Sequence, residues 1–248
     1  MILNFGSPGK SKAKMPPLFT YTGTYRYEES VAEDGTVNWE LAFLSSGTLT
    51  FQRVVDKIDV FLVGPGANGS DGSHNDSIAR SFGGKGGNGG ALVTCKGTSA
   101  ISVQAGTQYS ITIGTPGNAT TGFGKSAASG GGKTGGAGAY VTDNVYAGDN
   151  AGNGSDGERA FGGSTLLWNG YKYGASGGGG GVKSAVNYYE RSPGTGGTSG
   201  AGNGGAQNAN GGNATANSGS GGGGGGFYSW GGSGGSGGSG IIIIRNAR

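Results

Sequence analysis

Three Gly-Gly-X triplets follow one another in Gly83-Gly84-Lys85-Gly86-Gly87-Asn88-Gly89-Gly90-Ala91. Residues 231–240 repeat Gly-Gly-Ser with the same period. A period of three residues is that of the polyproline II helix, which rises about 3.1 Å per residue and makes no internal hydrogen bonds. Each backbone N–H and C=O then points sideways and needs a partner when it is buried. The repeat therefore predicts a bundle of short, left-handed polyglycine or polyproline II-type helices that are joined by backbone hydrogen bonds.

Three other interpretations of the glycines carry less weight. Collagen requires a strict triplet with abundant proline, and this chain has only 6 Pro. A flexible coil is common for Gly/Ser-rich chains, but large side chains such as Phe161, Leu166 and Trp168 are embedded among the glycines. An engineered linker at residues 231–240 would be followed by a second domain, whereas this run leads directly into an apolar strand.

The glycines are concentrated in one part of the chain. All but five of the 63 Gly in the 248-residue sequence lie at residues 64–240, and large apolar residues are concentrated before them. The sequence therefore predicts three parts. An N-terminal arm at residues 1–17 anchors the protein to an assembly. A β-rich head at residues 18–63 is completed by a strand at residues 241–245. The glycine-rich body occupies residues 64–240, with further strands near residues 91–113.

The head has the pattern of antiparallel β-strands. Asp34-Gly35, a common hairpin turn, separates two strand-like runs at residues 25–31 and 36–44. Four consecutive β-branched residues, Ile241–Ile244, favour a central buried strand. The last residues therefore return to the sheet that the first residues begin. The predicted fold class is all-β, with an antiparallel β-sheet or sandwich head, a large glycine-rich insertion, and few or no α-helices.

Charge and cysteine content exclude several partners and sites. The formal net charge is +3 and the basic residues form no stripe, so nucleic acid is not an expected partner. The single cysteine, Cys95, excludes an internal disulfide framework and a cysteine-cluster zinc site. Its strand-like neighbours indicate an inert buried thiol. The N-terminus lacks the apolar stretch of a signal peptide, so we expect synthesis in a cytoplasm without one.

Four motifs suggest chemistry but lack the structural context that the chemistry needs. Residues 64–69 match the dinucleotide-binding G-x-G-x-x-G pattern and residues 119–126 approximate a P-loop, but neither leads into a helix. Residues 152–156 resemble one turn of a calcium β-roll, which requires tandem copies. The only histidine, His74, lies in a polar stretch that supplies no shaped pocket. We therefore expect no catalytic residue, no metal, no cofactor and no enzymatic activity.

A polar segment occurs twice in the body. Gly69-Ser70-Asp71-Gly72 is followed by Arg80 and Phe82, and Gly154-Ser155-Asp156-Gly157 is followed by Arg159 and Phe161. This internal repeat predicts equivalent helices that stack in one bundle.

Aromatic residues interrupt the glycine triplets, so we expect them in the loops that connect the helices. Tyr and Trp provide a large contact area at a low entropic cost and keep a polar group, and their rings stack on sugar faces. The alternative is that these rings pack over the sheet or between layers of the bundle. The candidate contact residues are Tyr140, Tyr146, Trp168, Tyr171, Tyr173, Tyr188, Tyr189, Phe227, Tyr228 and Trp230.

The order of several motifs resembles the glycine-rich domain of bacteriophage tail proteins. The resemblance covers about residues 45–245, and its motifs are Ser45-Ser46-Gly47-Thr48-Leu49, residues 58–66, residues 109–114, residues 161–165 and the closing residues 240–245. The body is also similar in style to the tail-fibre tip adhesins of T-even-like phages. In those proteins, glycine-rich left-handed helices form a stacked core and loops at one end bind the host receptor.

The resemblance implies a non-enzymatic phage tail or baseplate tip protein that recognises the host cell surface. The expected partners are other tail or baseplate proteins and a bacterial surface glycan or envelope protein, with a homo-oligomer such as a trimer as a further possibility. The expected location is the virion tail tip, on its extracellular face. The alternative function is that of a purely structural tail component, a spacer or cap without a receptor site.

Overall fold

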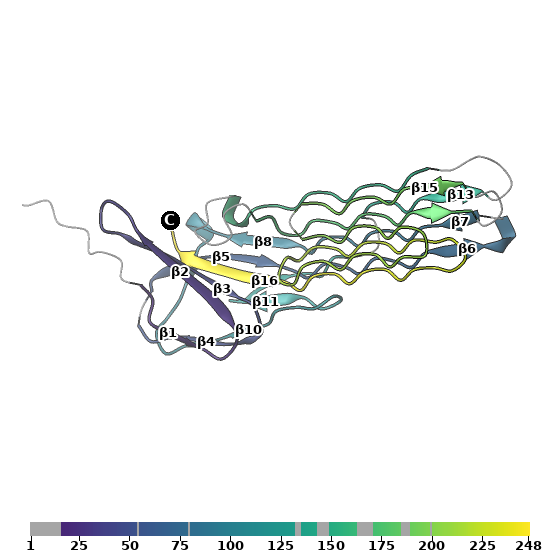
Figure 1. Ribbon diagram of the computed structural model, residues 1–248. Helices are drawn as coiled ribbons and strands as arrows, with labels where there is room; N and C mark the ends of the chain where they lie inside the picture. Colours follow the sequence, from purple (N-terminus) through teal and green to yellow (C-terminus); the bar gives the residue numbers. More distant parts are fainter. Residues whose placement is uncertain are drawn as a thin grey trace, which may run out of the picture.

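The computed structural model describes residues 16–53, 55–78, 80–131, 135–142, 149–162, 171–184, 189–198 and 200–248. Across these ranges the fold is all-β, with several antiparallel sheets and no α-helix. Short 3-10 helices are found at η1 (Asp76–Ile78), η2 (Gly97–Ser99) and η3 (Ala160–Gly162). The molecule is elongated, with a head of β-sheets at one end and a long body of extended segments that runs away from it (Figure 1).

The main sheet of the head has the closing isoleucine strand at its centre. β16 (Ile241–Asn246) lies between β3 and β5 and pairs antiparallel with both, so the end of the chain lies in the same sheet as its early strands. The strand order is β2 (Tyr25–Val31), β3 (Val37–Phe43), β16, β5 (Lys57–Val63) and β8 (Leu92–Cys95), and β9 (Ile101–Ser102) also pairs with β5.

A second, smaller sheet covers one face of the main sheet. It contains β1 (Phe19–Tyr21), β4 (Gly47–Phe51) and β10 (Gln108–Ile111), and a hairpin of β11 (Thr120–Gly122) and β12 (Lys125–Ala127) lies beside it. Ile242 and Ile244 of β16 belong to the core on this side. Ile241 and Ile243 point to the opposite face and pack with residues of the body. Both faces of β16 are therefore buried, and each fully buried Ile contributes about 1.5–3 kcal/mol of hydrophobic stabilisation.

The strands near residues 91–113 are part of the head. β8 and β9 pair with β5, and β10 pairs with β4. The sequence of the body is consequently split into two insertions. Residues 64–91 connect β5 to β8, and residues 128–240 connect β12 to β16.

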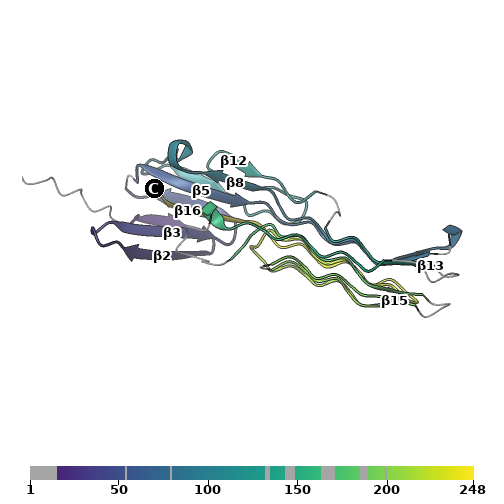
Figure 2. The ribbon, with the colours of Figure 1, turned by 90° about the horizontal axis from the view of Figure 1, so that it is seen from above.

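The body consists of extended glycine segments that lie side by side and bond through their backbones. The N–H groups of Gly66, Gly69 and Gly72 donate to the carbonyl oxygens of Gly238, Gly235 and Gly232, each at 2.9 Å. The bonding residues are three apart on both segments, and the two segments run in opposite directions. Figure 2 shows such segments running together from the head toward the end of the molecule that carries β13 and β15.

Two unbroken glycine runs, residues 177–181 and 221–226, lie inside the body. Within the second run, successive N–H groups donate to three different segments in rotation: Gly221 to Ala175, Gly222 to Ala67, Gly223 to Gly212, Gly224 to Gly178, Gly225 to Ser70 and Gly226 to Ala209. Backbone therefore surrounds the run. A Cβ atom on Gly223 would lie 1.8 Å from the carbonyl oxygen of Asn203, which no side chain can tolerate. Close approach of backbone, rather than turn geometry, requires glycine there.

The end of the body far from the head is closed by short strands. β7 (Arg80–Phe82) pairs with β6 (Ser73–Asn75) and β13 (Tyr140–Thr142), and β14 (Val182–Lys183) pairs with β15 (Glu190–Arg191). A small apolar cluster of Ala139, Val141 and Val182 joins these elements. We call this end the distal tip, and define it by residues 73–78, 80–82, 140–142, 182–184, 189–191, 206–209 and 227–231.

Candidate functional site

The candidate aromatic residues divide between the two ends of the body. Tyr146, Trp168 and Tyr188 lie outside the described residues. Tyr171 and Tyr173 lie beside the head, where Tyr173 packs against Phe61 of β5. The remaining residues belong to the distal tip: Tyr140, Tyr189, Phe227, Tyr228 and Trp230. The structure therefore brings together half of the candidates and separates them from Tyr171 and Tyr173 by the length of the body (Figure 1).

Some of the distal rings hold the tip together. Phe227 forms backbone bridges with Val182 and Gly231, and its side chain packs with Tyr189 around the apolar cluster of the tip. The His74 ring stacks on Phe227 at 6.0 Å between centroids and an interplanar angle of 18°. Phe227 and Tyr189 are half-buried, so they fit the alternative in which rings pack within the bundle.

Trp230 is presented to solvent on a turn that is held in place. Its side chain is 63% exposed. The Oδ1 atom of Asn208 accepts hydrogen bonds from the N–H groups of Ser229 and Trp230, at 3.1 and 3.2 Å. Asn208 itself has φ +57°, a left-handed conformation that asparagine tolerates better than most residues. The backbone beneath the Trp230 ring is thus fixed before any partner arrives.

Cations flank the other rings of the distal tip. The Lys183 ammonium lies 5.3 Å from the centroid of the Tyr228 ring and 3.3 Å from a carboxylate oxygen of Glu190. The Arg80 guanidinium lies 5.7 Å from the centroid of the Tyr140 ring. Ile78 adds an exposed apolar side chain. The tip therefore offers aromatic and apolar contact area beside positive charge, which is the composition of many interaction surfaces.

At the distal tip, the His74 ring contacts Ser81 through one nitrogen and Asp76 through the other, but these three side chains are not arranged for catalysis. The His74 ring contacts Ser81 Oγ at 3.0 Å through Nδ1 and an Asp76 carboxylate oxygen at 3.2 Å through Nε2. A nucleophilic serine must be accessible to its substrate, whereas Ser81 is only 1% exposed. Asp76 is fully exposed, so it cannot orient the ring in a dry pocket.

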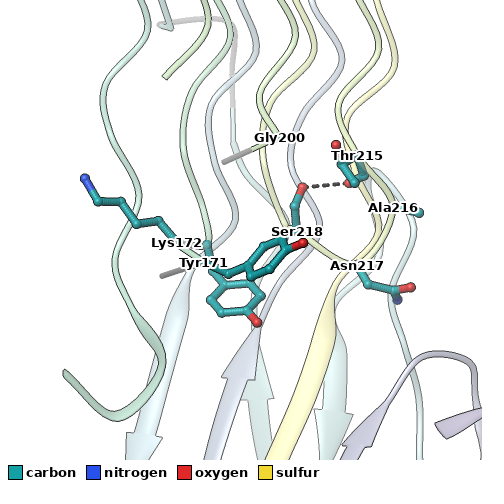
Figure 3. Close-up of a pocket in the computed structure, with 8 residues that line it drawn as sticks. Tyr171, Lys172, Gly200, Thr215, Ala216, Asn217 and Ser218 are labelled. Carbon is teal, nitrogen blue, oxygen red and sulfur yellow. Dashed lines mark hydrogen bonds between the residues drawn. The ribbon is translucent and has the colours of Figure 1, made fainter. Parts of the chain in front are cut away.

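A cavity of about 120 Å³ lies where the body meets the head. It is lined by Tyr171, Lys172, Tyr173, Gly200 and residues 215–218 (Figure 3). Tyr171 is 54% exposed, whereas Tyr173 is only 2% exposed and belongs to the core beneath the cavity. Burial raises the pKa of the Tyr173 hydroxyl well above its ordinary value. Tyr173 is therefore a packing residue and not part of an outward-facing loop.

Asn and Asp side chains at every third position close the outer edges of the body. Oδ1 atoms of Asn150, Asn153 and Asp156 accept hydrogen bonds from the N–H groups of Ser192, Thr195 and Thr198, at 3.1, 2.9 and 2.9 Å. The same pattern joins Asn210 and Asn213 to Ser233 and Ser236, and Asn68 and Asp71 to Gly237 and Gly234. Sequence reasoning missed this role, although the spacing of Asn and Asp by three residues is visible in the sequence.

These rows explain two features of the sequence. Asp71 and Asp156, which are equivalent in the internal repeat, both accept backbone N–H groups from a neighbouring segment. The stretch at residues 152–156 that resembles a calcium β-roll directs Asn153 and Asp156 at backbone donors. Among the residues that the structure describes, no three His, Cys, Asp or Glu side chains gather as a metal site would require.

The Asp156 carboxyl group should titrate well below an ordinary aspartate. The hydrogen bond from the Thr198 N–H and the nearby Lys172 ammonium, at 3.0 Å, lower its pKa to about 2. The pKa of this carboxyl group is lower in the folded state than in the unfolded state, so its contacts stabilise the fold at pH values above the ordinary pKa of Asp. This stabilisation is lost as the pH falls through the folded-state pKa of about 2. Carbon-13 NMR titration of the carboxyl carbon should give this value, and an ordinary pKa near 4 would contradict the contact. Asp156→Asn should keep the bond to Thr198, as Asn153 keeps its bond to Thr195.

Within the described ranges, no helix has the length and apolar character to cross a bilayer.

Comparison with known proteins identifies a family. Comparison with curated proteins gives no match. A glycine-rich domain family matches residues 44–247, from the turn before β4 to the end of β16. The match covers both insertions and the strands that tie them to the head, and on this basis the chain belongs to the glycine-rich domain family.

Proposed function

We propose that this protein is a non-enzymatic tail-tip protein of a bacteriophage and that it recognises the host cell surface through its distal tip. The observation that carries the proposal is the position of Trp230, exposed on a turn that Asn208 holds by two hydrogen bonds. Exposed tryptophan on a fixed backbone binds partners at a low entropic cost. The sequence resemblance to phage tail proteins supplies the biological setting.

We further infer that the glycine segments are polyglycine II helices packed as a bundle. Hydrogen bonds between segments recur every three residues, as in Gly66, Gly69 and Gly72. Around residues 221–226 the donors rotate through three neighbouring segments, as a threefold helix requires. Such a bundle has many backbone hydrogen bonds and few apolar contacts, so it forms a stiff support that keeps the distal tip away from the head.

In this proposal, the head and residues 1–17 attach the protein to other tail or baseplate proteins, and the protein assembles as a homo-oligomer such as a trimer. The distal tip then points away from the particle, toward a bacterial surface glycan or envelope protein. Trp230 and the Tyr228 ring beside Lys183 provide contact area, and positive charge favours an acidic surface. The protein is made in the host cytoplasm and acts at the extracellular face of the virion.

Binding to whole cells tests the proposal. The purified, fluorescently labelled chain should bind saturably to some strains in a panel of bacteria. Trp230→Ala should reduce that binding about 30-fold or more, because a central exposed tryptophan is a typical hot spot worth at least about 2 kcal/mol. Tyr171→Ala is the matched control, since it removes an exposed aromatic ring from the opposite end of the body and should leave binding unchanged.

The alternative function, a spacer or cap without a receptor site, makes the opposite prediction. A spacer would bind no strain although it is folded, or would bind equally well with and without the Trp230 side chain. Circular dichroism and thermal unfolding of each variant separate loss of binding from loss of folding. A drop in binding in Tyr171→Ala alone would place the recognition surface beside the head and would contradict the assignment of the distal tip.

A further inference from the structure

One long edge of the main sheet is open at β2. Within the described part of the chain, one side of β2 pairs with β3 and no strand pairs with its other side (Figure 2). β2 is seven residues long, and all of its residues are exposed except Tyr27, which is half-buried. An edge strand offers unpaired backbone N–H and C=O groups to any chain that can pair with it. This edge is therefore a candidate interaction surface.

The hydrogen bonds to β3 decide which residues of β2 face the open edge. The Leu44 N–H donates to the carbonyl of Thr24, and the Ala32 N–H donates to the carbonyl of Thr36, both at 2.9 Å. In an antiparallel ladder such bonded pairs recur at every second residue, so the even-numbered residues of β2 direct their backbone groups at β3. The residues that direct their backbone groups at the open edge have odd numbers: Tyr25, Tyr27, Glu29 and Val31.

The side chains of β2 suit a second copy of the same strand. Arg26 and Glu28 lie one residue before and one residue after Tyr27, and they point to the same face of the sheet because side chains alternate along a strand. When two copies pair antiparallel with Tyr27 opposite Tyr27, each Arg26 lies opposite the Glu28 of the other copy. Opposite charges in directly opposing positions stabilise a pair of strands. The strand is therefore complementary to itself.

The backbone agrees with this register. The two Tyr27 residues face each other across the open edge and exchange two hydrogen bonds, and on either side Tyr25 does the same with Glu29 of the other copy. The two neighbouring registers that also match the backbone place Arg26 opposite Arg26 or Glu28 opposite Glu28. Charges on an edge strand often prevent pairing, and like charges directly opposite each other destabilise it. Here the charges exclude the neighbouring registers and favour one.

We propose that β2 is a self-association edge, at which two copies of the chain pair their β2 strands antiparallel about a twofold axis at Tyr27. The exposed side chains of Tyr25 and Val31 add apolar contact area. Both copies use the same edge, so this contact closes at two copies, and a trimer requires a different contact. β2 lies in the head, so the pairing leaves the distal tip of each copy uncovered (Figure 1). This inference does not rest on the proposed receptor binding.

Sedimentation equilibrium of the full chain tests the inference. The wild-type chain should form dimers with a dissociation constant on the order of 10–100 μM, because one pair of strands buries little surface. Arg26→Glu and Glu28→Arg each convert both opposite-charge pairs into like-charge pairs, so each variant should dimerise about tenfold more weakly or worse. An equimolar mixture of the two variants restores opposite charges in both pairs. The mixture should therefore form heterodimers with an affinity within about threefold of wild type.

Glu33→Arg is the matched control. It makes the same change in charge as Glu28→Arg, at an exposed position in the turn after β2 that lies outside the proposed pairing. This variant should dimerise as wild type does. Circular dichroism shows whether each variant is folded.

Amide hydrogen exchange of the wild-type chain gives a second measurement, which decides the inference even if Arg26→Glu fails to fold. The amides of Tyr27 and Glu29 should exchange more slowly at dimer-forming concentrations than in dilute solution. The amides of Arg26 and Glu28 should depend much less on concentration, because their hydrogen bonds are made to β3 within one copy.

Dimers that the single variants lose and their mixture restores support the inference. A wild-type chain that stays monomeric at about 1 mM overturns it, since the expected dissociation constant is far lower. Dimers that both folded variants form as well as wild type also overturn it, as do wild-type dimers in which the Tyr27 and Glu29 amides gain no protection. Whole-cell binding through Trp230 is measured separately, so the failure of one proposal is distinguishable from the failure of the other.

Discussion

Gly223→Ala is expected to destabilise the protein by at least about 3 kcal/mol, enough to prevent folding of a marginally stable chain. The added Cβ would lie 1.8 Å from the carbonyl oxygen of Asn203 and 2.4 Å from its carbonyl carbon. Relief requires separation of two backbones that are themselves bonded to other segments, so the strain cannot be confined to one side chain. Soluble yield and chemical unfolding of the purified variant measure the effect.

Gly131→Ala is the matched control for this substitution. It makes the same chemical change in the body, but a Cβ atom there meets nothing within 4 Å. We expect this variant to unfold at the wild-type denaturant concentration or slightly above it, because alanine reduces the conformational entropy of the unfolded chain. Equal stability of the two alanine variants would show that backbone does not surround residues 221–226 closely.

Arg245→Met is expected to cost about 3–5 kcal/mol, because it removes the cation from a buried row of charges. Arg245 on β16 lies in register with Asp59 on β5 and with Glu40 on β3, and all three residues are buried. Its Nε donates to Asp59 at 3.0 Å, and its guanidinium lies 4.2 Å from the centroid of the Phe161 ring. The substitution would leave two buried carboxylates without this counter-charge. Urea unfolding at neutral pH measures the loss.

An exposed ion pair provides the comparison for this substitution. Lys172→Met removes the cation of the exposed pair with Asp156 and should have little effect on the free energy of unfolding. A loss in Arg245→Met that is no larger than the loss in Lys172→Met would contradict the importance of the buried charges.

Local pattern was sufficient to predict much of the head. The Asp34-Gly35 hairpin forms between β2 and β3, and β-branched Ile241–Ile244 lie in the centre of the main sheet. Cys95 is buried at the end of β8, as its neighbours indicated. These features depend on residues close in sequence and on the burial of large apolar side chains, which a single sequence displays directly.

The neighbours of each glycine segment could not be predicted from the sequence. The period of three residues indicates where side chains are absent, but not which of many similar segments fills the space. The N–H groups of residues 221–226 donate hydrogen bonds to carbonyl groups as distant in the sequence as those of Ala67 and Ser70. The strands between residues 92 and 127 return to the head because β8 and β10 find partners there, a pairing across distant parts of the chain.

The aromatic candidates were predicted as one class but fall into two. Triplet interruption places a residue at the end of a glycine segment, and each segment has one end near the head and one at the distal tip. The sequence does not distinguish these ends, so Tyr173 in the core and Trp230 in solvent look alike. The Oδ1 atom of Asn208 accepts hydrogen bonds from the N–H groups of Ser229 and Trp230, about twenty residues away in the sequence. Contacts between residues so far apart leave no local sequence pattern that would predict them.

Amide hydrogen exchange at residues 221–226 tests the central claim most directly, because a rigid glycine body underlies every role proposed for the distal tip. Six consecutive glycine N–H groups that each donate to a neighbouring segment should all exchange slowly, to a degree comparable with the amides of β16. Exchange of these amides at the rate of an unstructured peptide would contradict the account, because a flexible glycine chain could not hold Trp230 in a fixed position.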